Sequence, residues 1–237
     1  MSFAQCIWRE CLWQFATKTL LALFAASARI RVIFYHDLPK NCGFILASNH
    51  ISHFDPPLIT LFFPRRIDWI AMSDLFRGRI LRRLFSDLNV IPIERNGPDR
   101  AALRIAVGRL KEGRVVGIFP EGGIRDGAAS IVNSAEMKQG VSLLFALSDA
   151  PVIPCVILGS DRLYNPRSWL PWRRPGIWIG YGKPILPLRH LAGEKKKDYV
   201  RKLFGSEIVK LKERLCEDFR LTEADLPHPP RHRMREP

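Results

Sequence analysis

The chain contains 237 residues, of which 47% are hydrophobic and 25% are charged. This length and composition exclude an intrinsically disordered protein and predict one globular domain with a substantial core and short appendages. Lysine and arginine outnumber aspartate and glutamate by 37 to 23, a formal net charge of +14 that favours an anionic partner: a nucleic acid, an anionic membrane, or a phosphorylated substrate or carrier. The five cysteines are scattered and lack zinc-binding spacing, so we expect reduced structural thiols in a cytosolic setting.

Residues 1–34 are rich in apolar and aromatic side chains and are interrupted by charges. The uncharged stretch 19–28 would span roughly 15 Å as a helix, about half of the ~30 Å hydrocarbon layer of a bilayer. We therefore expect a helix that lies in the membrane interface rather than one that crosses it. Two alternatives are packing of this segment on the core, and a signal peptide cleaved near 26–28, against which the length of the preceding region and Glu10 argue.

A histidine and an aspartate follow the apolar run 43–48, which reads as a buried strand. His50 comes just after this run, and Asp55 precedes two prolines that suit the first turn of a helix. An imidazole whose tautomer is fixed by a carboxylate can take a proton from a hydroxyl, so a substrate that brings its own hydroxyl needs no serine or cysteine nucleophile. The alternative is an ordinary helix cap beside a satisfied loop histidine.

The next segments continue the alternation of strands and helices. We expect a strand at 68–72, an amphipathic helix at 74–88, a strand at 89–95 and a helix at 98–111. The arginines of helix 74–88 form either a solvated basic face or a membrane-facing patch. Arg95, at the end of its strand, is able to hold a phosphate.

A tight glycine loop follows the predicted strand at 115–119. Glu121, Gly122 and Gly123 stand there, and glycines in such a loop let backbone N–H groups approach an anion. The ends of parallel strands meet at one edge of a sheet. The three strand ends could therefore form one pocket.

The remaining chain carries further elements of both kinds. These are a helix at 140–149, strands at 152–157 and 176–180, with 182–185 continuing or pairing, an irregular surface loop at 159–175, and a helix at 195–219. Such alternation predicts an α/β domain with a largely parallel central sheet flanked by helices. We divide the chain into a membrane-interface helical segment at 1–34, a domain at 35–222 and a basic disordered tail at 223–237.

These blocks resemble the glycerolipid acyltransferase family, most closely the 1-acyl-sn-glycerol-3-phosphate acyltransferases. The matching blocks, which agree in order and spacing across about residues 43–157, are Asn49-His50 with Asp55, Ile93-Glu94-Arg95, Phe119-Pro120-Glu121-Gly122, Val152-Ile153-Pro154-Cys155 and a Lys-x-Gly turn at Lys138. The family commonly follows Glu-Gly with Thr-Arg-Ser, whereas this chain has Gly123-Ile124-Arg125, which places the arginine one position later.

The resemblance implies transfer of a fatty acyl group from the thioester of coenzyme A or acyl carrier protein to the hydroxyl of a lysophospholipid. The expected acceptor is lysophosphatidate, giving phosphatidate, and no metal or further cofactor is implied. His50 would be the general base and Asp55 would orient it. The implied binding roles are the acceptor phosphate for Arg95 with Lys138 or Arg125, the glycerol hydroxyl or the loop for Glu121, and phosphate or oxyanion binding by backbone N–H groups near Gly122 and Gly123.

The expected partner surface is an anionic membrane, with the protein monotopic or peripheral on its cytoplasmic face. Three alternatives remain: acylation of glycerol-3-phosphate or of a lyso-amino-lipid, a non-catalytic basic membrane-binding protein, and a nucleic-acid-binding protein. We expect no nucleic acid, because no recognised nucleic-acid-binding motif occurs.

Overall fold

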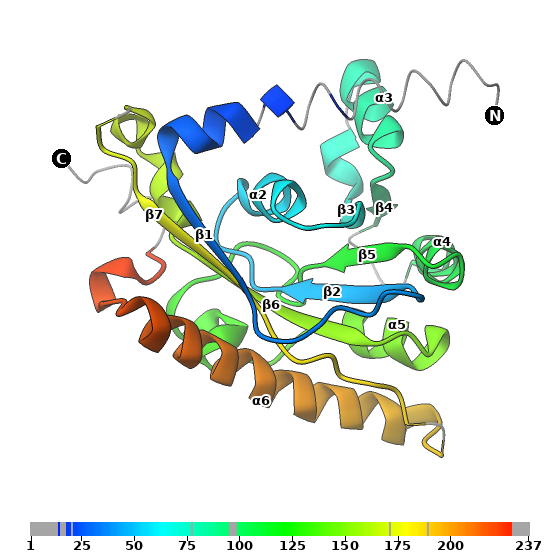
Figure 1. Ribbon diagram of the computed structural model, residues 1–237. Coiled ribbons are helices and arrows are strands. Elements are labelled where there is room, and N and C mark those ends of the chain that lie inside the picture. The colour runs from blue at the N-terminus through cyan, green and yellow to red at the C-terminus, as the bar shows by residue number, and fades with distance from the viewer. Residues whose placement is uncertain are drawn as a thin grey trace.

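The structure is a computed structural model, and it describes residues 14, 18–19, 21–76, 78–94, 99–170, 172–188 and 190–228. The described residues form a seven-stranded sheet of order β1-β7-β6-β2-β5-β3-β4, with helices on both faces (Figure 1). The strands are β1 (Arg29–Phe34), β2 (Phe44–Ser48), β3 (Ile67–Met72), β4 (Ile91–Ile93), β5 (Val115–Ile118), β6 (Val152–Leu158) and β7 (Gly176–Tyr181). The α-helices are α2 (Asp55–Leu61), α3 (Arg79–Asp87), α4 (Arg100–Lys111), α5 (Gly140–Ser148) and α6 (Gly193–Phe219). The 3-10 turns are η1 (Ser73–Phe76), η2 (Gly127–Ala129), η3 (Ile131–Asn133), η4 (Ser160–Tyr164), η5 (Pro166–Trp169) and η6 (Glu223–Asp225), and residues 21–27 are also helical.

The direction of the strands confirms a largely parallel sheet. β6, β2, β5, β3 and β4 run parallel, β7 is antiparallel to β6, and β1 is parallel to β7. The start of β7 therefore lies beside the end of β6, where Leu158 pairs with Trp178. As a result, β1 and β7 begin at the same end of the sheet at which β2, β5 and β6 finish.

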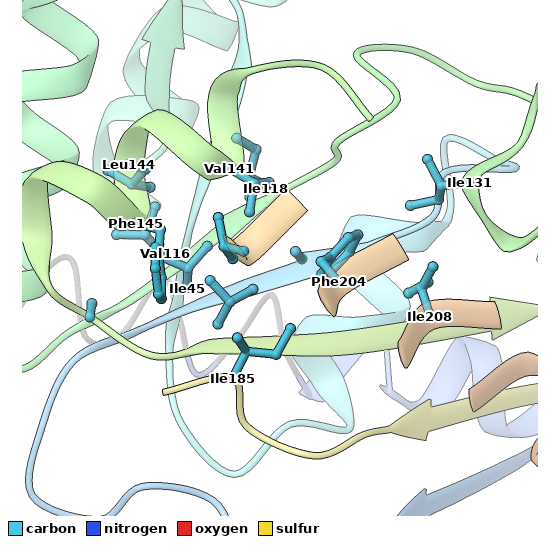
Figure 2. Packing of buried hydrophobic residues seen from close by; sticks show 14 of the residues in the cluster. Ile45, Val116, Ile118, Ile131, Val141, Leu144, Phe145, Ile185, Phe204 and Ile208 are labelled. Atoms are coloured by element: carbon cyan, nitrogen blue, oxygen red, sulfur yellow. The ribbon is translucent and has the colours of Figure 1, made fainter. Parts of the chain in front are cut away.

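Alternating strand residues supply two separate cores, because successive side chains of a strand point to opposite faces. Ile45 and Val116 pack with α4, α5 and α6, and Figure 2 shows them beside Phe145, in the cluster that also holds Phe204 of α6. Phe44 and its alternate neighbours pack on the other face, under α2 and the helical residues 21–27. The parallel strands are buried on both faces and so read as continuous apolar runs.

Two expected boundaries are wrong. The helix expected at 74–88 is broken into η1 and α3, and Gly78 between them has a φ of 91°, a backbone conformation that an α-helix cannot contain. The strand expected at 89–95 is limited to Ile91–Ile93, with Asn89 in the left-handed region at a φ of 60°. The segment expected to follow β7 pairs through Ile185, which bridges Val152 of β6.

Both ends of the chain contribute to the fold in the parts that the structure describes. Phe24 and Ala28 are buried, so 21–28 packs on the core, while Leu21 and Leu23 remain exposed. No helix among the described residues combines the length and apolar character needed to cross a bilayer. Residues 223–228, expected to begin the disordered tail, instead bind η4 through an Arg162–Asp225 ion pair of 2.8 Å. Residues 1–13 and 229–237 lie outside the described residues.

Candidate active site

The carboxylate of Asp55 is held by a cage of hydrogen-bond donors. Asp55 is the first residue of α2 and is fully buried. Its position at a strand–helix junction brings it close to backbone N–H groups. Its Oδ2 accepts from the N–H groups of Ile51 and Ser52, both at 2.8 Å. Its Oδ1 accepts from the hydroxyl of Ser160 in η4. A buried carboxylate is tolerated when its lone pairs are satisfied in this way.

The same carboxylate contacts the ring of His50. Nδ1 of His50 lies 2.9 Å from Oδ2 of Asp55, as the sequence predicts for the pair. The Nδ1–H tautomer of the neutral ring suits this contact, since Nδ1–H can donate to Oδ2 alongside the two backbone N–H groups. Nε2 then keeps its lone pair and can accept a proton from a hydroxyl. The His50 side chain is 15% exposed, against 0% for Asp55, so only the histidine of the pair is accessible.

Two aromatic rings support one face of the imidazole. Phe119, the residue that follows β5, stacks on His50 with ring centroids 4.1 Å apart and planes 21° apart. Trp69 of β3 stacks in turn on Phe119 at 4.7 Å and 6°. The indole Nε1–H of Trp69 donates to Thr60 Oγ1 at 2.8 Å, which ties the stack to α2. The ring of His50 is therefore oriented by a carboxylate at one nitrogen and by an aromatic face.

Glu121 joins the His50 loop to the loop after β5. Its Oε2 accepts from the N–H of His50 at 2.6 Å, and its Oε1 accepts from the hydroxyl of Ser130 at 2.7 Å and the N–H of Ile131 at 2.9 Å. The side chain is 4% exposed. Burial raises the pKa of Glu121, and the hydrogen bonds from Ser130, Ile131 and His50 oppose that rise. The sequence predicts that Glu121 positions either the glycerol hydroxyl or the loop. The observed contacts are with the loop.

The glycine loop is closed by its own backbone and by a lysine. Gly122 has a φ of 64°, and its N–H donates to Phe119 O at 3.0 Å, so this N–H is engaged within the protein. A Cβ at Gly122 would lie 2.7 Å from the side chain of Lys138, which places that lysine against the loop. The N–H of Gly123 makes no hydrogen bond to any other described residue. The loop thus brings an N–H donor and an exposed ammonium group together.

Of the two arginines expected to bind phosphate, the structure describes only Arg125. Arg125 is exposed, its guanidinium donates to the carbonyl of Ile124 at 3.2 Å, and its N–H donates to the carbonyl of His50 at 2.8 Å. Arg125 is thus fixed by its backbone to His50. Arg95 lies outside the described residues.

Asn49 and Ser160 each support the site through a contact that the sequence does not reveal. The amide of Asn49 donates to Ile157 O at 2.9 Å and accepts from Ile157 N–H at 2.8 Å, which extends the β2–β6 ladder beyond its last backbone pair. Gly159 then turns with a φ of 83°, and a Cβ there would lie 2.3 Å from Gly176 O. This turn directs Ser160 to Asp55. No local pattern marks Ser160 or the Phe119–Trp69 stack, because each acts on a residue that is distant in the chain.

A cavity of about 280 Å³ lies between the N-terminal helical residues and the end of α2. Its lining includes Lys18, Leu21, Leu61, Phe63 and Arg66. Neither His50 nor Asp55 lines this cavity, although Thr60, which accepts the hydrogen bond from Trp69, does.

A sequence model of the acyltransferase family matches residues 29–158, which is more than half of the chain. The chain is 24% identical over 151 residues to a 1-acyl-sn-glycerol-3-phosphate acyltransferase of Bacillus subtilis, covering 62% of this chain and 72% of that protein. It is 25% identical over 146 residues to a Borreliella burgdorferi protein of the same name, covering 61% of this chain and 57% of that protein.

A solved structure has the same fold. The 1-acyl-sn-glycerophosphate (LPA) acyltransferase PlsC from Thermotoga maritima aligns with a TM-score of 0.61 at 24% identity, covering 88% of this chain and 81% of that chain. The family match and these relatives confirm the resemblance inferred from the motif blocks. The chain therefore belongs to the acyltransferase family and is an enzyme similar to the 1-acyl-sn-glycerol-3-phosphate acyltransferases.

Proposed function

We propose that this enzyme transfers a fatty acyl group from an acyl thioester, of coenzyme A or acyl carrier protein, to the free hydroxyl of a lysophospholipid. The preferred acceptor is lysophosphatidate, which becomes phosphatidate. Two relatives named for 1-acyl-sn-glycerol-3-phosphate support this choice of acceptor. The observation that carries the proposal is the buried Asp55 carboxylate hydrogen-bonded to Nδ1 of His50.

In this mechanism His50 acts as a general base. Nε2 takes the proton of the acceptor hydroxyl while the hydroxyl oxygen attacks the thioester carbonyl. A C–O bond forms and the C–S bond breaks, and the departing thiolate takes the proton back from the imidazolium. Asp55 stabilises that imidazolium through Nδ1, and general-base help of this kind contributes about 10²–10⁴-fold in rate. The acceptor supplies the nucleophile, so the reaction proceeds without an acyl-enzyme, and neither a metal nor a further cofactor takes part.

The loop beside His50 supplies candidate anion-binding groups. The side chain of Lys138 packs against Gly122, next to Gly123, and Arg125 is anchored to His50 through its backbone. We assign the acceptor phosphate to Lys138 and Arg125 together with Arg95, and the developing oxyanion to the N–H of Gly123. The role of Glu121 is to hold the catalytic loop in this arrangement.

The proposed setting is the cytoplasmic face of a membrane, with the protein bound as a monotopic or peripheral enzyme. The lysophospholipid acceptor resides there, and the net charge of +14 favours an anionic lipid surface. The loop arginines and lysine would then meet an acceptor whose phosphate lies at the same level as the lipid head groups.

An acyl-transfer assay tests the function directly. It would cross lysophosphatidate, glycerol-3-phosphate and lyso-amino-lipid acceptors with acyl-CoA and acyl-carrier-protein donors, in the presence of lipid vesicles. We expect lysophosphatidate to give the highest kcat/KM. Absence of acyl transfer from either donor to every acceptor in the panel would overturn the proposal.

A histidine substitution tests the mechanism. His50→Ala should reduce kcat by at least about 10²-fold while leaving the thermal melt nearly unchanged. His36→Ala, at an exposed histidine, is the matched control and should keep full activity. Normal turnover by the His50 variant would remove this residue as the base.

A further inference from the structure

Two segments that are distant in the chain lie side by side. Residues 21–28 and 166–175 are joined by Arg174, whose guanidinium donates to the carbonyls of Ala25 at 2.6 Å and Ala28 at 3.2 Å. The rings of Phe24 and Trp169 also pack, with centroids 6.0 Å apart. Figure 1 shows both segments on the side of the sheet that carries α2. We call the surface of these two joined segments the 21/172 face.

This face exposes large apolar side chains. Trp172 is 77% exposed, Leu23 is 47%, Leu21 is 41% and Leu170 is 36%. The Trp172 value is the highest among the exposed large hydrophobic residues of the described part of the chain. An exposed tryptophan with neighbouring leucines marks an interaction site rather than an ordinary surface.

The charge of the same segments has a single sign. The sequence contains no aspartate or glutamate between residues 11 and 36, or between 162 and 193. The arginines at positions 29, 167, 173 and 174 are exposed. Tryptophan and leucine interspersed with arginine match the interface of an anionic bilayer, where the apolar groups enter the head-group region and the cations face the lipid phosphates.

The strand topology places this face at the end of the sheet where His50 lies. Arg29 pairs with Gly176, so both segments enter the sheet at the same end. Because β7 runs antiparallel to β6, that end is also where β2 and β6 finish, next to His50. Phe54, in the catalytic loop, packs directly on Trp169 with centroids 5.6 Å apart. A bilayer that binds the 21/172 face would therefore lie beside the loop that carries His50.

We propose that the loop of residues 166–170 and 172–175, which carries the exposed Trp172, is a docking element that binds an anionic lipid bilayer together with residues 21–29. This inference rests on the proposed function, in which a lipid acceptor reaches His50 from a membrane. The loop adds a second contact to the N-terminal segment and so fixes the orientation of the catalytic edge toward the bilayer.

Vesicle binding by the full chain tests the docking element. Sedimentation with phosphatidylglycerol vesicles would compare the unaltered protein with Trp172→Ser and Arg167→Glu. Leu147→Ser is the matched control, because Leu147 is 53% exposed but lies on α5, on the opposite face of the sheet. We expect Trp172→Ser to weaken partitioning by about tenfold and Leu147→Ser to leave it unchanged. Arg167→Glu should weaken binding to phosphatidylglycerol vesicles but not to phosphatidylcholine vesicles.

Equal partitioning of Trp172→Ser and the unaltered protein would overturn the proposal. Equal binding of the unaltered protein to both vesicle types would overturn the assignment of an anionic surface. A change in self-association of Trp172→Ser, seen by sedimentation velocity without a change in vesicle binding, would assign the face to a second copy of the chain instead.

A soluble-substrate assay separates this inference from the proposed function. Trp172→Ser should acylate a short-chain lysophosphatidate below its micelle concentration as fast as the unaltered protein does. If the unaltered protein lacks this activity but still binds vesicles through Trp172, the proposed function fails while the docking element stands.

Discussion

The ring of Phe119 lies face to face with the imidazole of His50, with centroids 4.1 Å apart and planes 21° apart. Phe119 stands at the end of β5 and His50 just after β2, and these two strands are neighbours in the sheet. The stack therefore couples the orientation of the proposed base to the packing of the sheet.

Phe119→Leu should lower kcat by roughly 10- to 100-fold, because it removes the flat surface that orients the imidazole while keeping an apolar side chain. Phe119→Tyr keeps the ring and should retain most of the activity. Steady-state kinetics of both variants, with a thermal melt to compare their stability, provide the measurement. A leucine variant with unaltered kcat would show that the stack does not position His50.

Ser160→Ala should reduce kcat by about tenfold and leave KM unchanged, because it removes the hydroxyl that donates to Oδ1 of Asp55. If Ser160 acts through Asp55, the same substitution in an Asp55→Asn background should add little further loss. Ser142→Ala, at another fully buried serine on α5, is the control for removal of a buried hydroxyl. Additive losses in the double variant would contradict the positioning role.

Glu121→Gln should destabilise the folded protein by about 1–3 kcal/mol and also lower activity, since an amide cannot accept all three of the hydrogen bonds that the carboxylate accepts. With its oxygen toward Ser130 and Ile131, the amide nitrogen would face the N–H of His50, a donor against a donor. Urea denaturation and kcat measured on the same preparation check both effects. Unchanged stability with a selective increase in the KM for the acceptor would instead favour a direct role in substrate binding.

Asp99 caps α4 and gives a prediction of pH dependence. Its Oδ1 accepts from Ala101 and Ala102 N–H, its Oδ2 accepts from Glu94 N–H, and these bonds hold its pKa below the ordinary value of 3.8. Asp99→Ala should therefore cost about 0.5–2 kcal/mol of stability near neutral pH. Because the folded pKa is lowered, the charge-dependent part of the contribution of Asp99 is present above about pH 3.8 and is lost as the pH falls through the folded value.

Urea denaturation of the unaltered protein and of Asp99→Ala over a series of pH values measures this contribution. The difference in stability between the two proteins should narrow as the pH is lowered, because protonated Asp99 loses its charge but keeps a capping oxygen. Asp99→Asn keeps a capping oxygen without a titrating group, so it should remain more stable than the alanine variant at every pH. A difference that grows toward acid would contradict the prediction.

The local features of the candidate site follow from neighbouring residues and could be predicted. The apolar run before Asn49 indicates a buried strand, and two prolines after Asp55 indicate the start of a helix. A histidine five positions before that aspartate then lies within reach of it across the strand–helix turn. The glycines after Glu121 likewise indicate a tight turn, which the structure has at Gly122.

Other predictions failed or stayed open. Helix 74–88 has a continuous apolar pattern, but Gly78 adopts a left-handed conformation and divides it. The sequence leaves the role of Glu121 open between substrate and loop, because its hydrogen bond to His50 joins residues that are 71 positions apart. The pairing of Ser160 with Asp55 joins residues that are 105 positions apart, and no spacing rule connects them.

The sequence by itself determined the apolar periodicities of strands and helices, the alternation of these elements and the motif blocks. Each of these depends on residues a few positions apart. Only the tertiary structure decided that β7 reverses direction and brings Trp172, Trp169 and Ser160 to the end of the sheet where His50 lies. The physical reason is that strand order and direction depend on which buried surfaces fit together. Many different apolar runs satisfy the same local pattern, so that pattern cannot specify its partner.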